Sequence, residues 1–151
     1  ERRETNLALI FVDLDRFKPV NDSHGHTIGD QLLQQVAYRL SSAVRSSDTV
    51  GRIGGDEFVI LLGDIADAAM AGELAEKIRQ SVSLPFVVNT IELTISCSVG
   101  IAVYPRDGTD EATLLNSADK AMYSAKEQGR NKVKQALESN TVESSLIIAQ
   151  K

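Results

Sequence analysis

The sequence predicts an α/β or α+β sandwich, in which helices cover a β-sheet. Segments with strand character and segments with helical spacing of apolar residues alternate along the chain. The first strand, Leu7–Asp13 (LALIFVD), is a continuous apolar run that ends in an acid, which is typical of a central strand buried on both faces. The chain has 151 residues, of which 42% are apolar and 25% charged, and this suits one domain with a single core.

The elements that follow the first strand are a helix and a hairpin. A helix is expected from about Gly29, because apolar residues recur at helical spacing as far as Val44. Residues 49–62 (TVGRIGGDEFVILL) predict two strands joined by a turn, since Gly54 and Gly55 tolerate the positive φ that hairpin turns need.

The second half continues the alternation. Residues 64–82 predict an amphipathic helix, residues 91–105 a long strand stopped by proline, residues 109–130 a third helix and residues 131–135 a short last strand. Polar residues that can cap the two helices are Asp64 or Asp67 and Thr109 or Asp110. We expect residues 1–135 to form the domain and residues 136–151 to be a C-terminal tail or linker.

Composition excludes several classes of function. The net charge is −5, with 16 basic and 21 acidic side chains, which argues against sequence-independent binding of nucleic acid. No run approaches the roughly 18 apolar residues of a membrane helix, so we expect no direct membrane contact and a cytoplasmic location. Cys97 is the only cysteine, and we expect it to be a small buried hydrophobe. The chain begins without Met, so we expect it to belong to a longer parent protein.

Acidic residues stand at two points where strands end. Asp13 ends the predicted central strand, and Asp56 and Glu57 stand at the hairpin tip. We expect Asp13 and Asp15 to point to opposite faces, so that only one of them serves a given site. Carboxylates brought together favour Mg²⁺ or Mn²⁺, which prefer hard oxygen ligands. A solvated acidic turn explains the hairpin acids equally well, and spacing alone leaves the two interpretations level.

Cations near the C-terminus favour a phosphate ligand. Lys126 and Arg130 are four residues apart and could share a helical face that grips a triphosphate, although cations at a helix end also suit the helix dipole. Lys18 and the backbone amides of residues 16–18, Phe17 among them, are further candidates for phosphate binding. His24 and His26 lack a third ligand nearby, so we interpret them as packing and hydrogen bonding in a loop. The residues alone indicate a metal-dependent enzyme acting on a nucleotide-like phosphate.

Four sequence blocks together resemble a known family. "DLDRFKPVNDSHGHTIGD", "RIGGDEF", "ISCSVGIA" and "ADKAMYSAKEQGRNKV" are similar, in this order, to the GGDEF domain of diguanylate cyclases over roughly residues 7–133. The resemblance implies a central, mostly antiparallel sheet flanked by helices, related to the polymerase palm and to nucleotide cyclases, with the GGDEF hairpin at the active site. It also implies condensation of two GTP molecules into cyclic di-GMP by a homodimer.

The same resemblance assigns roles to residues of the active site. Asp13, Asp56 and Glu57 would hold Mg²⁺ with help from the Leu14 carbonyl, and Asp56 would also help to deprotonate the 3′-hydroxyl. The other assigned residues bind GTP: Asn21 and Asp30 read guanine, Gly54 and Gly55 let the backbone approach the phosphates, and Lys126 and Arg130 grip them. The Asp-x-Leu-Thr segment and short helix that the family carries ahead of the first strand are absent from this chain.

A product-inhibition site is also implied. Arg45 and Asp48 form an RxxD motif, separated from Gly54 by five residues, where the family binds cyclic di-GMP as an inhibitor. Many members add a second arginine from the following helix; here we expect Lys77 in that position, with Arg79 as a possible substitute.

Three hypotheses of function remain open at this point. The first is an active diguanylate cyclase. The second is a catalytically silent module that binds GTP or cyclic di-GMP and regulates a neighbouring domain, such as a sensor or phosphodiesterase domain. A purely structural domain is the third, and it leaves the paired acids and the terminal cations unexplained. The intact set of acids favours catalysis.

Overall fold

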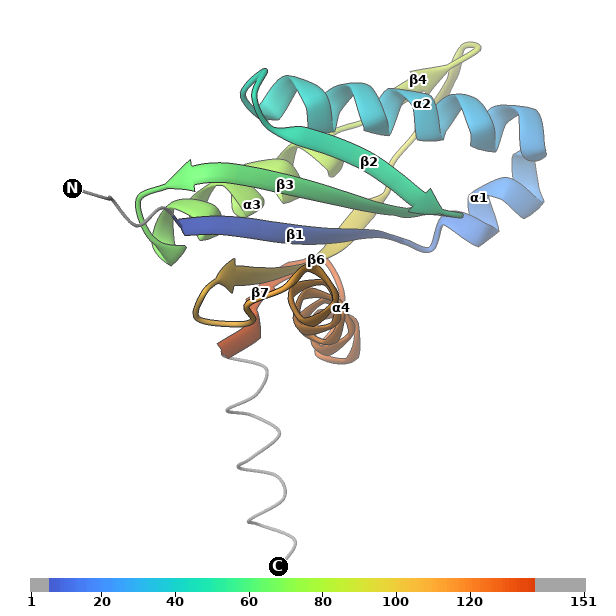
Figure 1. Ribbon diagram of the computed structural model, residues 1–151. Helices are drawn as coiled ribbons and strands as arrows, with labels where there is room; N and C mark the ends of the chain where they lie inside the picture. The colour runs from blue at the N-terminus through green and yellow to red at the C-terminus, as the bar shows by residue number, and fades with distance from the viewer. Residues whose placement is uncertain (1–5, 138–151) are drawn as a thin grey trace, which may run out of the picture.

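The computed structural model describes residues 6–137 (Figure 1). Strands and helices alternate along the chain, as the sequence predicts. The elements are β1 (Asn6–Asp15), α1 (Phe17–His24), α2 (His26–Ala43), β2 (Thr49–Gly54), β3 (Glu57–Ile65), α3 (Ala68–Val82), β4 (Phe86–Val88), β5 (Ile91–Leu93), β6 (Ser96–Tyr104), α4 (Glu111–Glu127) and β7 (Lys132–Gln135).

A five-stranded sheet forms the centre of the molecule, in the order β2-β3-β1-β6-β7. All neighbouring strands are antiparallel except β6 and β7, which are parallel. The strands β4 and β5 form a separate two-stranded sheet. The predicted fold class, a mostly antiparallel α+β sheet flanked by helices, is therefore confirmed, with the first apolar run as the middle strand.

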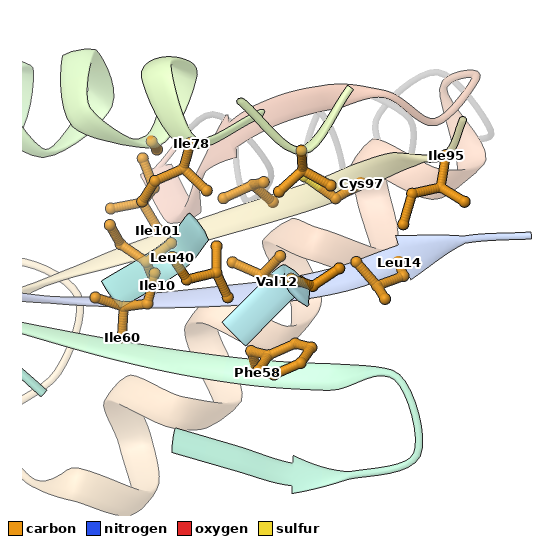
Figure 2. Packing of buried hydrophobic residues seen from close by; sticks show 14 of the residues in the cluster. Ile10, Val12, Leu14, Leu40, Phe58, Ile60, Ile78, Ile95, Cys97 and Ile101 are labelled. Carbon is orange, nitrogen blue, oxygen red and sulfur yellow. The ribbon is translucent and has the colours of Figure 1, made fainter. Parts of the chain in front are cut away.

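Side chains of β1 alternate between two faces of the sheet. Ala8, Ile10, Val12 and Leu14 belong to the larger core, which α2 and α3 cover. Figure 2 shows this core, in which Ile10, Val12 and Leu14 lie among side chains of β3, β6, α2 and α3. Leu9 and Phe11 face the other way and pack with Leu114, Ala118 and Met122 of α4. The acids that continue this second set, Asp13 and Asp15, therefore lie on the face that α4 covers.

Close contact between α4 and β6 fixes where the end of that helix lies. A Cβ atom at Gly100 of β6 would overlap the Ala118 carbonyl oxygen and the Met122 amide of α4. Only glycine lets the two backbones approach this closely. Because α4 cannot shift away from the sheet without losing this packing, Lys126 in its last turn is held over the end of β1.

The helix caps agree with the sequence. Asp67 and Asp110 precede α3 and α4, and their side chains accept hydrogen bonds from the backbone amides of Met70 and Thr113 at 2.9 and 2.7 Å.

Cys97 is fully buried in the larger core, as expected, and burial raises the pKa of its thiol to about 12. Within residues 6–137, no helix has the length and apolar character required to cross a membrane.

Other predictions were wrong in detail. The long strand expected over residues 91–105 is two strands, because β5 pairs with β4 whereas β6 pairs with β1. The helix expected from Gly29 begins at His26. Helix α1 and strand β4 were not predicted; α1 has eight residues, and its Phe17 and Val20 are only partly buried against the core, so its apolar pattern is too short to detect. The division between residues 1–135 and 136–151 stays a prediction, and of the second part the structure describes residues 136 and 137.

Candidate active site

The hairpin tip lies against the end of the central strand. Asp13 and Glu57 are directly opposite each other across β1 and β3, and the Leu14 amide donates a hydrogen bond of 3.1 Å to the Asp56 carbonyl. Partners directly across an antiparallel pair have Cβ atoms about 4.5–5.5 Å apart and point to the same face. The backbone thus brings the three predicted acids, Asp13, Asp56 and Glu57, to one end of the sheet.

Two glycines shape the tip itself. Gly55 has φ +45° and Gly54 has φ +157°, and a Cβ atom at either position would meet no atom within 4 Å. The left-handed backbone at Gly55 is one that a β-carbon disfavours. The open space around both residues leaves room for a ligand to approach the hairpin backbone.

The environment of this corner disfavours the charged forms of Asp13 and Glu57. Burial is the main cause that raises the pKa of Asp13 to about 7; the negative charges of Asp56 and Glu57 add to it, and Lys126 opposes it. The pKa of Glu57 is also raised, by burial first and then by Asp119 and Asp56. Excess negative charge at a partly buried site favours a bound cation.

Lys126 is the cation that the chain itself supplies. Its Nζ lies 3.6 Å from Asp13 Oδ1 and 3.5 Å from Asp15 Oδ1. The expectation that Asp13 and Asp15 point to opposite faces was wrong, because residues two apart on a strand share a face. Within residues 6–137, no three Asp, Glu, His or Cys side chains are grouped closely enough to bind one metal ion together. The donor chemistry nevertheless suits a hard cation, because all three predicted ligands are carboxylates.

The predicted guanine-reading residues lie on α1 and α2. A side chain at the buried Gly29 would overlap Asn21 Oδ1 and crowd the Phe17 ring, so glycine lets α1 pack closely on α2. The Asn21 amide lies 2.9 Å from His26 Nδ1. Asp30 lines a groove of about 410 Å³ between α2 and the β2–β3 hairpin. Asn21 is not among the residues that line this groove.

The two histidines lie in helices and not in a loop. His24 is the last residue of α1 and His26 is the first of α2, with Gly25 between them at φ +90°. The loop interpretation was therefore wrong, although the hydrogen-bonding role of His26 is supported by its contact with Asn21.

The other candidate phosphate-binding groups lie at the start of α1 and after the end of α4. Arg16, between β1 and α1, has a left-handed backbone. The exposed Lys18 and the first backbone amides of α1 therefore follow directly after the end of β1. Arg130 does not share a helical face with Lys126, because α4 ends at Glu127 and Arg130 has φ +65°. Arg130 instead follows a turn in which its amide donates to the Ala125 carbonyl at 2.9 Å.

The RxxD residues lie in a different hollow. A cavity of about 210 Å³ is lined by Arg45, Asp48 and Lys77, together with Glu73 and apolar side chains. Arg45 forms an ion pair with Asp48 at 3.1 Å and also donates to the Gly63 carbonyl. Arg79 does not line this cavity: it contacts Glu76 and donates to Asn131 Oδ1 at 2.7 Å. Of the two candidates on α3, the structure therefore brings Lys77 to the RxxD motif.

Asp48 is more stable as a carboxylate than Asp13 or Glu57, because its pKa is lowered whereas theirs are raised. Burial alone would raise its pKa, but hydrogen bonds from the Arg45 side chain and from the amides of Arg45 and Gly63 outweigh burial and lower it.

Sequence comparison gives a consistent family. A family model described as "Diguanylate cyclase, GGDEF domain" matches residues 1–132. The bifunctional diguanylate cyclase/cyclic di-GMP phosphodiesterase MucR of Pseudomonas aeruginosa is 48% identical over 130 residues, covering 86% of this chain and 19% of MucR. The chain thus spans about a fifth of the length of that relative.

Solved structures agree with this result. The GGDEF domain of TpbB (YfiN) from Pseudomonas aeruginosa is 41% identical with a TM-score of 0.85, over 87% of this chain and 82% of that one. The GGDEF domain of DgcB from Caulobacter crescentus, solved in complex with c-di-GMP, is 31% identical with a TM-score of 0.78, over 87% of this chain and 78% of that one.

Proposed function

The chain belongs to the GGDEF family of diguanylate cyclases, and we propose that it condenses two GTP molecules into cyclic di-GMP. Each 3′-oxygen attacks the α-phosphorus of the other GTP. Two phosphodiester bonds form, two bonds to pyrophosphate break, and the two hydroxyl protons are taken up by a base. The products are one cyclic di-GMP and two pyrophosphates.

The observation that carries the proposal is the contact of the hairpin tip with β1. The Leu14–Asp56 hydrogen bond and the Asp13–Glu57 pairing hold three acids at the end of the sheet, in a place where their mutual repulsion favours a cation. We assign Asp13, Asp56, Glu57 and the Leu14 carbonyl to Mg²⁺ or Mn²⁺. When bound, the metal supplies positive charge that lowers the pKa of the attacking hydroxyl and stabilises the leaving pyrophosphate. Asp56 is the acid that we assign to accept the hydroxyl proton.

The rest of the site binds the nucleotide. Asp30 lines the groove beside the hairpin, where a carboxylate can accept hydrogen bonds from guanine N1–H and N2–H₂, and Asn21 contributes an amide. The open space at Gly54 and Gly55 admits the phosphates. Their charge is met by Lys126 and Arg130, and by Lys18 and the amides at Phe17.

The reaction requires two copies of the domain. One domain binds one GTP, and both 3′-hydroxyls must face the α-phosphate of the opposite nucleotide. A homodimer with two facing sites satisfies this geometry. Cyclic di-GMP then inhibits the enzyme from the separate cavity of Arg45, Asp48 and Lys77.

A second candidate is a regulatory module that binds GTP or cyclic di-GMP without turnover. In its favour, the described acids are not grouped closely enough to hold one ion together, and Lys126 contacts Asp13. The relative MucR also combines cyclase and phosphodiesterase activities in a longer protein. We favour catalysis because every acid of the hairpin and both guanine-reading residues are present. In either case we propose a cytoplasmic location, a domain over residues 1–135 and tethering to further domains.

The test is to incubate the protein at high concentration with GTP and Mg²⁺ and to analyse the nucleotides by mass spectrometry. We expect cyclic di-GMP from the wild type and none from Asp56→Ala. If GTP stays intact, the assay is repeated with the domain fused to a dimeric coiled coil. Continued absence of product in the fusion would reject catalysis in favour of the regulatory module.

A further inference from the structure

Asp15 is a buried acid that the proposed reaction does not use. Its exposed fraction is 2%, yet it accepts hydrogen bonds of 2.6 Å from the hydroxyls of both Ser96 and Ser98. The Asn131 amide donates to it at 3.0 Å, and Lys126 Nζ lies 3.5 Å away. A buried carboxylate is costly unless donors surround it, and here donors reach both of its oxygens. We call these five residues the Asp15 cluster.

The cluster joins three parts of the fold that are far apart in the sequence. Asp15 ends β1, the two serines begin β6, and Lys126 and Asn131 flank the turn between α4 and β7. That turn contains Arg130, the second candidate phosphate-binding cation. Asp15 therefore contacts the backbone amide of Asn131, which follows Arg130, and the side chain of Lys126, which precedes it.

The backbone of this turn needs external support. Arg130 and Asn131 both have left-handed conformations, with φ +65° and +50°. Each such residue costs roughly 1–2 kcal/mol when it is not glycine, with asparagine at the lower end. Asp15 holds the Asn131 backbone, and Arg79 of α3 holds its side chain through a 2.7 Å hydrogen bond to Oδ1. Arg79 therefore supports this turn through Asn131, and it does not line the RxxD cavity.

We propose that Asp15 is a positioning residue for the triphosphate of the substrate, and that Arg79 assists it through Asn131. Asp15 attracts Lys126 and fixes the turn that presents Arg130, so it determines where both cations point. This inference rests on the proposed function, because it takes Lys126 and Arg130 to be the groups that bind the phosphates.

The test compares binding of two nucleotides by calorimetry in the presence of Mg²⁺. The probes are guanosine 5′-(α,β-methylene)triphosphate, which cannot release pyrophosphate, and GMP, which lacks the β- and γ-phosphates. Asn in place of Asp15 has the same size but neither the charge nor the second acceptor oxygen. We expect Asp15→Asn to weaken triphosphate binding about tenfold, the scale of one hydrogen bond to a charged group. Binding of GMP should change less than about twofold, because its guanine contacts lie elsewhere.

A matched control separates positioning from general loss of stability. Asp107 is also a buried acid, with a side chain 4% exposed, and it accepts a hydrogen bond from the Val103 amide at 2.8 Å. It lies at the opposite end of β6 from the Asp15 cluster. Asp107→Asn should lower the melting temperature and leave binding of both nucleotides unchanged. Arg79→Gln should weaken the triphosphate alone, by about threefold, since it acts at one step removed.

Three results would overturn the inference. Asp15→Asn binds the triphosphate as the wild type does, or it loses triphosphate and GMP binding in equal proportion, or the wild type binds no triphosphate at all. The last result would also remove the proposed function. A wild type that binds the triphosphate but forms no cyclic di-GMP would reject catalysis alone, and a selective defect in Asp15→Asn would then still support the positioning role.

Discussion

Two sites of this molecule pair acids with a cation, and they do so in opposite ways. At the hairpin corner, burial and neighbouring acids raise the pKa of Asp13, and its cationic contact, Lys126, is shared with Asp15. At the RxxD cavity, Asp48 accepts hydrogen bonds from the Arg45 side chain and from two backbone amides, and these lower its pKa against the effect of burial. Acid–cation contacts therefore occur both at a corner with excess negative charge and in a cavity where Asp48 is already paired.

The contrast indicates how each site meets a ligand. Under the proposed function, a cation at the corner would relieve repulsion between Asp13, Asp56 and Glu57, although Lys126 already contacts Asp13 there. A ligand at the RxxD cavity has to compete with the existing Arg45–Asp48 pair for hydrogen bonds. The first arrangement suits metal-dependent chemistry, and the second suits reversible inhibition of modest affinity.

Asp13→Asn is the largest expected effect and tests the corner directly. Loss of a metal-binding charge should lower cyclic di-GMP formation at least about 10³-fold, the scale seen when a group that stabilises transition-state charge is removed. In metal-free buffer the variant should be at least as stable as the wild type, because one repelling charge is gone. Product chromatography and thermal unfolding measure the two effects. Activity within tenfold of the wild type would contradict the metal assignment.

Arg45→Ala tests the cavity. We expect the concentration of cyclic di-GMP that gives half inhibition to rise by roughly tenfold or more, since a charged hydrogen-bonding partner is lost. The initial rate should stay unchanged, because Arg45 lines a cavity separate from the acidic corner. Initial-rate assays with added cyclic di-GMP give both quantities. An unchanged inhibition curve would refute the site.

Asp48→Asn tests the electrostatic half of the contrast. The pKa of Asp48 is lowered in the folded state, so its charge stabilises the fold above the ordinary value near 3.8 and this contribution is lost as the pH falls through the folded-state pKa. At pH 7 the variant should lose about 1 kcal/mol of unfolding free energy, a modest value because Arg45 is exposed and solvent screens the pair. Urea unfolding at pH 7 and in acid measures the difference, which should shrink in acid. A difference that is constant with pH would show that the charge of Asp48 is not the cause.

The sequence predicted the parts of the fold that depend on local pattern. The apolar run of β1, the Gly-Gly hairpin and the caps Asp67 and Asp110 each have a short-range signal, and the structure confirms them. Helix α1 is too short for such a signal, because only Phe17 and Val20 of its eight residues pack against the core, and both are partly buried. The left-handed backbone at Arg130 was not predicted either, because the four-residue spacing of Lys126 and Arg130 suits a helix but α4 ends at Glu127.

The contacts of Asp15 could not be predicted from local sequence pattern, because they join residues far apart in the chain. Asp15 meets Ser96, Ser98 and Asn131, partners that are 81, 83 and 116 residues away in the chain. Only the sheet order, with β6 beside β1, brings them together. Its shared face with Asp13 could have been deduced from the two-residue period of a strand.

Lys77→Arg is the smallest expected effect and sharpens the account of the cavity. Lys77 lines the cavity with Arg45 and Asp48 but supplies a point charge, whereas arginine offers a planar fork that can donate two parallel hydrogen bonds to a phosphate or a guanine edge. We expect inhibition by cyclic di-GMP to become tighter by about two- to fivefold, with initial rates unchanged. Lys77→Gln, which keeps a polar side chain without the charge, is the matched control and should weaken inhibition by a similar factor. If both variants inhibit as the wild type does, Lys77 lies beside the ligand without contacting it, and Arg45 and Asp48 alone form the polar part of the inhibitory site.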